Sequence, residues 1–233
     1  YGWYPENITM DILNCYLLDL NQDITIAYNG SVPNPEDVEI PLSSGWNWIS
    51  YTPTTSSDIN TALALFTPSN QDYIKSQTSS STYYSSGGVW YPDITLQPTK
   101  GYMLSASIEQ SLFYPEVESN VSEEDLLLRN NYEPEFNYRE YEFNASATLE
   151  LDMPHLEVTN NDRIEVFYNN ELRGVAQGDI CPLNDKILFN LMIYSNNQSD
   201  ENVKTVSTCS NVEDRTCLST NIKSFSDKMT PFN

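Results

Sequence analysis

The stretch Leu42-Ser-Ser-Gly-Trp-Asn-Trp-Ile-Ser-Tyr51 decides the fold class of this chain. Trp46 and Trp48 fall on one side of its pattern, and Asn47 and Ile49 fall on the other. A period of two is typical of a β-strand, which points successive side chains to opposite faces of a sheet. We therefore expect a strand here, with the two tryptophans in the core of its module because large aromatic side chains gain most from burial.

The composition extends this expectation to the whole chain. The sequence holds 16 Tyr, 4 Trp and 13 Pro, which is typical of many short strands joined by polar turns. Residues 58–66 have the pattern of a helix, with Ser57 or Asp58 as the N-cap and Pro68 just beyond the end. The predicted fold class is all-β with one short helix.

The 233 residues are enough for two modules with separate cores. We expect an extended N-terminal segment at residues 1–39, a first β module at 40–108, an immunoglobulin-like β-sandwich at 114–203 and a polar tail at 204–233. The sandwich is predicted from alternating strands separated by Asn, Asp, Gly or Pro. The chain opens at Tyr1 without a signal peptide, as expected of a processed product or of a piece of a longer polyprotein.

The charge balance excludes one class of partner. The sequence has 33 acidic and 11 basic residues, for a net charge of −22. Nucleic-acid binding needs clustered Lys and Arg against phosphates, so nucleic acid is not an expected partner. No apolar run approaches the roughly 18 residues of a membrane-spanning helix, so no membrane span is expected.

Cysteines and glycosylation sequons indicate a secreted, extracellular or cell-surface protein. The four cysteines form no Cys-x-x-Cys pair and the sequence has 1 histidine, which disfavours zinc and favours disulfides in an oxidising compartment. We pair Cys209 with Cys217 across a short loop and, by elimination, Cys15 with Cys181. N-linked glycans are expected at the Asn-x-Ser/Thr sequons, which begin at Asn7, Asn29, Asn120, Asn144 and Asn197.

The sequence gives no sign of catalysis. His155 stands beside Pro154 in a predicted turn, and no Gly-x-Ser-x-Gly or cysteine signature accompanies it. Solvated strand faces explain the many carboxylates better than a glycosidase pair does. Calcium stays open at residues 35–39 and 119–125, although neither has the spacing of a calcium-binding loop. We predict no enzyme and no cofactor.

Further motifs follow the opening stretch in the first module. They are Asp-Tyr-Ile-Lys-Ser-Gln at residues 72–77, Trp90, and Pro-Thr-Lys-Gly-Tyr-Met-Leu at residues 98–104. In this order and spacing they resemble the tandem Gly-Trp-Asn-Trp-Ile-Ser module of large secreted bacterial surface proteins. In that family a β-sandwich follows the module, and residues 162–176 and 191–196 resemble two of its segments. The members look like adhesins, stalks and ancillary parts of secreted proteins, so the resemblance implies an architecture and no activity.

Ile24, Ile26 and Tyr28 alternate along a strand pattern that ends at the Asn29-Gly30 turn. This piece resembles the last strands of the family's sandwich, displaced here to the N-terminus. We expect these three side chains to form a donor strand that completes the sandwich of a neighbouring copy. The expected function is a structural subunit of an extracellular glycosylated fibril or surface layer, which assembles head-to-tail with copies of itself.

The alternative is a carbohydrate-binding or adhesive module of a larger secreted protein, whose N-terminal strand folds back onto its own second module. Exposed aromatic side chains would then stack on sugar rings. The candidates are Trp3, Tyr4, Tyr83, Tyr84, Trp90 and Tyr91.

Overall fold

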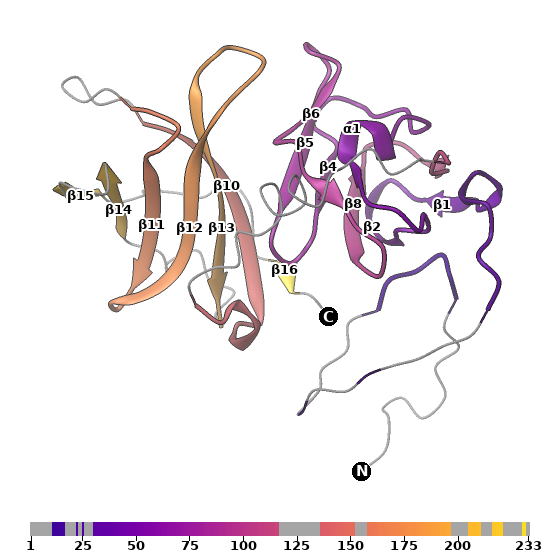
Figure 1. The fold of residues 1–233 in the computed structure, drawn as a ribbon, viewed down its shortest axis with the longest axis horizontal. Coiled ribbons are helices and arrows are strands. Elements are labelled where there is room, and N and C mark those ends of the chain that lie inside the picture. The colour runs from indigo at the N-terminus through magenta and orange to yellow at the C-terminus, as the bar shows by residue number, and fades with distance from the viewer. Residues whose placement is uncertain are drawn as a thin grey trace. The chain divides into compact units, whose positions relative to one another are not determined.

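A computed structural model describes residues 11–16, 22, 25, 30–116, 136–151 and 158–196, and the backbone of residues 205–210, 216–220 and 230–231. Strands dominate these residues, with one short α-helix among them, so the predicted all-β class is confirmed (Figure 1). Two compact units divide the chain. Unit 1 comprises Tyr1–Ser76 and Ser81–Asn130, and unit 2 comprises Gln77–Ser80 and Asn131–Asn233. No helix in the described part is long and apolar enough to cross a membrane.

A five-stranded sheet in the order β2-β8-β4-β5-β6 forms the centre of unit 1. β2 pairs with β8 so that Ser50 lies opposite Gly101. Two small pairs, β1 with β9 and β3 with β7, complete the unit together with the 3-10 helix η1 (Pro35–Asp37). The strands are β1 (Ile40–Leu42), β2 (Gly45–Ser50), β3 (Ser57–Asp58), β4 (Tyr73–Lys75), β5 (Ser80–Tyr84), β6 (Val89–Tyr91), β7 (Thr95–Leu96), β8 (Gly101–Ala106) and β9 (Gln110–Leu112).

Helix α1 (Ile59–Ala62) is shorter than the predicted helix over residues 58–66. Asp58 is its N-cap, because its Oδ1 accepts a hydrogen bond of 3.0 Å from the Thr61 N–H. Beyond Ala62 the chain makes tight turns, in which the Phe66 N–H donates to the Leu63 carbonyl at 3.0 Å. These turns bury Leu63 and Phe66 in the core, which ends the helix early.

The core of unit 1 lies on one face of the five-stranded sheet. Ile49, Ile74 and Leu104 are fully buried there. Trp46 lies on the alternate side of β2 and is 45% exposed, and Trp48 is half-buried. The prediction that both tryptophans belong to the core is therefore wrong, since the strand alternation puts them on the face opposite Ile49.

In each unit, a buried aspartate accepts hydrogen bonds that stabilise the turn before a strand. In unit 1, Asp72 Oδ2 accepts from the Ser69 N–H (2.8 Å), and Oδ1 accepts from the N–H and hydroxyl of Ser107 (2.8 and 2.6 Å). In unit 2, Asp162 Oδ2 accepts from the N–H of Thr159 (2.7 Å). Both aspartates stand three residues after the Ser or Thr whose N–H they accept, immediately before β4 and β11.

The strands of unit 2 form one sheet in the order β15-β14-β11-β12-β13-β10-β16 (Figure 1). β12 joins its two halves, since it pairs first with β11 and then, from Gly178 to Ile180, with β13. Asn169 and Asn170, with φ of 51° and 66°, make the two-residue turn between β11 and β12, as a type I′ hairpin requires. The strands are β10 (Phe143–Glu150), β11 (Arg163–Tyr168), β12 (Glu171–Ile180), β13 (Ile187–Ser195), β14 (Thr205–Ser210), β15 (Thr216–Thr220) and β16 (Thr230–Pro231).

Ile164, Val166, Phe189 and Ile193 lie at the centre of the core of unit 2. β11 hydrogen-bonds directly with β12, whereas the immunoglobulin order puts the second and third strands in different sheets. The observed pairing gives no support to the immunoglobulin-like assignment, which stays a prediction.

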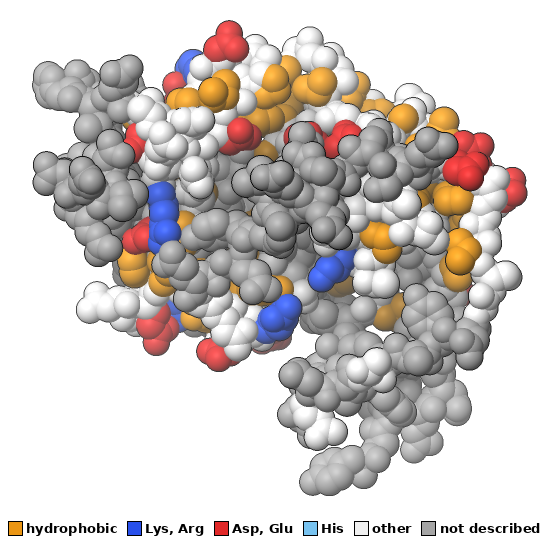
Figure 2. Space-filling view, viewed as in Figure 1, with side chains coloured by type: hydrophobic (Ala, Val, Ile, Leu, Met, Phe, Trp, Pro, Cys, Tyr) orange, Lys and Arg blue, Asp and Glu red, His pale blue; other side chains and the backbone are white. Residues whose placement is uncertain are grey.

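Charged side chains are interspersed on the surface. On the face shown in Figure 2, the coloured Lys and Arg side chains are scattered and form no continuous patch. Several described basic side chains pair with carboxylates of unit 2: Arg163 with Glu165, Arg173 with Glu171 at 2.6 Å, and Lys186 with Glu150 at 2.7 Å.

Candidate functional site

Strand β10 is the candidate assembly surface of unit 2. It pairs with β13 along its whole length, from Phe143 to Glu150. On its other side β16 pairs with it only at Phe143 and Asn144. The described part of the chain places no strand on this outer side of residues 147–150, which we name the β10 edge. Unpaired N–H and C=O groups on such an edge are a template for a strand from another chain.

The apolar face of unit 2 is incompletely covered beside this edge. Ala145 is buried in the core, whereas Ala147 and Leu149, which share its face of β10, are half-buried. Phe143, Leu149 and Leu151 pack against the core with part of their surface exposed. An added strand would therefore gain both ladder hydrogen bonds and apolar contacts.

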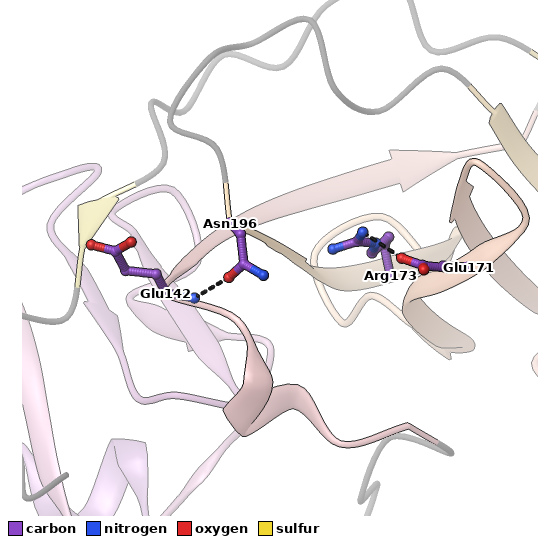
Figure 3. A network of polar contacts seen from close by, with 4 residues as sticks. All are labelled: Glu142, Glu171, Arg173 and Asn196. Atoms are coloured by element: carbon purple, nitrogen blue, oxygen red, sulfur yellow. Dashed lines mark hydrogen bonds and ion pairs between the residues drawn. The ribbon is translucent and has the colours of Figure 1, made fainter.

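A polar network fixes the start of β10. Figure 3 shows the Glu142 N–H donating to Asn196 Oδ1, which follows β13, at 2.9 Å. On β12, Arg173 donates to the Glu171 carboxylate at 2.6 Å. The Arg173 guanidinium also lies over the Tyr141 ring, 4.4 Å from its centroid. These contacts hold the first residues of β10 against the ends of its neighbours.

Aromatic side chains surround Tyr194 at the same end of the sheet. Phe136 and Tyr138 lie with their ring centroids 5.6 and 5.7 Å from that of Tyr194, and Tyr141 lies at 6.4 Å. Burial, and secondarily the neighbouring Tyr138, raises the pKa of the Tyr194 hydroxyl well above its ordinary value. This hydroxyl therefore stays protonated and donates to the Gln77 carbonyl at 2.9 Å.

Asn144, a predicted glycosylation site, is 3% exposed. It lies between β13 and β16, opposite Tyr194 and Thr230. Its Nδ2, the atom to which a glycan would be attached, donates to the Gln77 carbonyl at 3.2 Å. A glycan does not fit at this nitrogen in the folded sheet, so the prediction for Asn144 is corrected.

Many of the other predicted site residues lie outside the described residues. They are the sequons at Asn7, Asn29, Asn120 and Asn197, the donor-strand residues Ile24, Ile26 and Tyr28, and His155. The predictions made for them stay predictions.

The cysteines fall into two pairs with different outcomes. Cys209 on β14 lies directly opposite Cys217 on β15 in the strand register, an arrangement that suits the predicted bond between them. Cys15 and Cys181 are free thiols. The predicted bond between these two is thus not formed in the structure, where the Cys15 thiol donates to the Tyr102 carbonyl and Cys181 is buried after β12.

The N-terminal segment contacts unit 1, which the sequence did not suggest. The Ser50 N–H at the end of β2 donates to the Leu13 carbonyl at 3.4 Å, and Cys15 lies against Gly101. The glycine that opens β8 is the one sequence signal that could have indicated this contact, since glycine within a strand marks a close approach of another backbone.

The aromatic side chains proposed for sugar stacking are arranged differently from the prediction. Trp90 and Tyr91 are 4% exposed, and Trp90 packs on Tyr83 with ring centroids 5.5 Å apart. Trp46 is the exposed tryptophan of the described residues, with Tyr73 edge-on at 5.9 Å and Lys75 Nζ 5.5 Å from its ring centroid. Trp3 and Tyr4 lie outside the described part.

Two carboxylates of residues 35–39 make protein contacts. Glu36 accepts from the Glu116 N–H at 3.3 Å, and Glu39 accepts from the Ser111 hydroxyl at 2.6 Å. Within the described ranges no three His, Cys, Asp or Glu side chains gather as metal ligands would. Residues 119–125 lie outside these ranges.

Comparison with known proteins gave no relative. No family model matches the chain, no curated protein matches it, and no solved structure matches it.

Proposed function

We propose that this chain is a structural subunit of an extracellular, glycosylated fibril or surface layer, which assembles by donating a β-strand to a neighbouring copy. The observation that carries the proposal is the β10 edge, residues 147–150, where the described residues leave a strand of the sheet without an outer neighbour. The acceptor is this edge. The donor is the segment around Ile24, Ile26 and Tyr28 of another copy.

The two surfaces match in chemistry. The half-buried Ala147 and Leu149 share one face of β10. In the donor, Ile24, Ile26 and Tyr28 share one face of the predicted strand. A donor strand at the edge would place its three apolar side chains beside those of β10 and extend the core of unit 2. Donation of this kind is head-to-tail and does not close, so repetition gives a filament.

A charge added at the edge tests the proposal. Thr148→Lys places an ammonium group at an exposed position of the β10 edge, and edge lysines oppose strand addition. Gln177→Lys is the matched control, because it adds the same charge at an exposed position of the interior strand β12. Light scattering and negative-stain microscopy should show fibres from the wild-type chain and the control, and none from Thr148→Lys. If Thr148→Lys forms as many fibres as the wild-type chain, the β10 edge is rejected as the acceptor.

The second candidate is a carbohydrate-binding or adhesive module, and Trp46 favours it. This side chain is 45% exposed on the sheet face turned away from the core, and a half-exposed indole is a surface on which a sugar ring can stack. Calorimetry with neutral oligosaccharides should show binding that Trp46→Ala removes. Ile108→Ala, which truncates a side chain that is 49% exposed, is the control. Monomeric protein with Trp46-dependent sugar binding would favour this candidate over the fibril.

A further inference from the structure

Residues 11–16 form a compact turn on unit 1. Asp11 Oδ1 accepts hydrogen bonds from the backbone N–H groups of Leu13 (2.9 Å) and Asn14 (3.2 Å). The carbonyls of this turn face the end of β2. The Leu13 carbonyl accepts from the Ser50 N–H at 3.4 Å, and the Ser50 hydroxyl donates to the Ile12 carbonyl. β2 is an edge strand of the five-stranded sheet, so the turn covers part of that edge.

Side chains strengthen the contact. Leu13 packs against the core of unit 1, and the Cys15 thiol donates to the Tyr102 carbonyl at 3.7 Å. Gly101 makes the close approach possible. A Cβ placed there would collide with Cys15 Cβ and would lie 2.8 Å from its Sγ. Any side chain at Gly101 must therefore displace residues 11–16 or Gly101 itself.

A second anchor lies on the other side of the donor strand. The Glu116 N–H donates to Glu36 at 3.3 Å, and Val38 is buried in the core of the same unit. Both the turn before the donor strand and the segment after it are thus held on unit 1.

The two anchors limit the reach of the donor strand. The chain between them, residues 17–35, spans roughly 65 Å when fully extended at about 3.4 Å per residue. Pinned at both ends, it can extend from unit 1 by no more than about half of that length. With one end released, the donor strand gains close to the full length.

We propose that residues 11–16 are a clasp that holds the N-terminal segment on its own unit 1, and that release of the clasp controls strand donation. The second part of this proposal, that the clasp controls strand donation, rests on the proposed function. The clasp itself stands on the contacts with Ser50, Gly101 and Tyr102. In the closed state both ends of the segment that carries the donor residues are held on unit 1, and in the open state its N-terminal end is free.

Alkylation of Cys15 reports the state of the clasp directly. Burial raises the pKa of the Cys15 thiol from 9.0 to about 11. Two pKa units lower the thiolate fraction at pH 8 about 100-fold, and the greater nucleophilicity of the more basic thiolate restores about tenfold of this. Cys15 in the closed clasp should react about tenfold more slowly than a cysteine in an unstructured peptide.

The experiment compares the wild-type chain with Gly101→Ala and Gly30→Ala. Gly101→Ala should open the clasp through the collision with Cys15. Gly30→Ala is the control, because a Cβ there meets nothing within 4 Å. Ser50→Ala removes the hydroxyl bond to Ile12 and opens the clasp in part, without a steric clash. Iodoacetamide labelling at pH 8, resolved by peptide mass spectrometry, should give the peptide rate for Gly101→Ala, an intermediate rate for Ser50→Ala and the slow rate for the control.

Fibre growth is measured on the same samples. Faster growth from Gly101→Ala together with faster labelling supports the proposal. Unchanged labelling in both clasp variants, or wild-type Cys15 bound in a disulfide, overturns the clasp. If the clasp variants label faster but their fibres grow at the wild-type rate, strand donation stands and its control by the clasp is rejected. Faster labelling with no fibres from any variant rejects strand donation itself, and the control with it.

Discussion

Replacement of Asp72 by Ala should destabilise unit 1 strongly. The carboxylate is 1% exposed and accepts three hydrogen bonds from two residues, Ser69 and Ser107. Hydrogen bonds to a charged group contribute about 1.5–3 kcal/mol each, and donors left without a partner add their desolvation cost. Because losses at neighbouring groups are not additive, we expect a decrease of about 3–5 kcal/mol in the free energy of unfolding.

The assay is urea denaturation at pH 7 followed by tryptophan fluorescence. The chain has 4 tryptophans, and the three that the structure describes, Trp46, Trp48 and Trp90, belong to unit 1, so their signal reports this unit. Asp72→Asn should lose about half as much stability, since its amide nitrogen cannot accept a hydrogen bond. Glu109→Ala, at an exposed position, is the control for loss of charge. If Asp72→Ala unfolds within about 0.5 kcal/mol of the wild type, the turn does not depend on this carboxylate and the reasoning is refuted.

Two further predictions concern alkaline pH and the cysteines. Burial is the main cause that raises the pKa of the Tyr51, Tyr102 and Tyr114 hydroxyls well above the ordinary value of 10.0. As the pH rises, these hydroxyls therefore lose their protons in the unfolded chain before they do so in the folded one. The free energy of unfolding keeps this contribution in full below pH 10 and falls above it by up to about 1.4 kcal/mol per pH unit for each group. Equal free energies of unfolding from urea denaturation at pH 8 and pH 11 would contradict this. A disulfide between Cys209 and Cys217 should appear in non-reduced peptide maps, and its reduction should cost unit 2 about 2–3 kcal/mol for so short a loop, unless the map shows two free thiols.

The alternation in the sequence predicted the positions of strands, but it did not predict which face of β2 is buried. β2 lies where the opening stretch places it, and β11 and β13 lie within residues 114–203, where alternating strands were predicted. Alternation assigns residues to two sides of a strand, but it does not say which side faces the core. Trp46 and Ile49 are both apolar, and packing against Ile74 and Leu104 decides that Ile49 is buried.

The candidate site was less predictable because its residues depend on distant partners. A sequon is a local triplet, and the burial of Asn144 comes from strands more than 40 residues away along the chain. Pairing Cys15 with Cys181 by elimination assumed that every thiol is oxidised, and it used no information on position. The β10 edge follows from the order of strands in the sheet, which alternation within one strand does not determine.

The strength of the clasp is compatible with the free energy that strand addition at the β10 edge can supply. Strand addition along residues 147–150 offers a few ladder hydrogen bonds at about 1 kcal/mol each, and burial of the donor side chains adds several kcal/mol at about 25 cal/mol per Å². Association itself costs at least about 4 kcal/mol, so little free energy is left to open a strong lock. The clasp fits this limit, since its hydrogen bonds to Ser50 are few and one of them, from the Ser50 N–H, is long at 3.4 Å. Under the proposal, a contact of this strength is released when a neighbouring copy captures the donor strand, and it holds residues 11–16 on unit 1 while no neighbour is present.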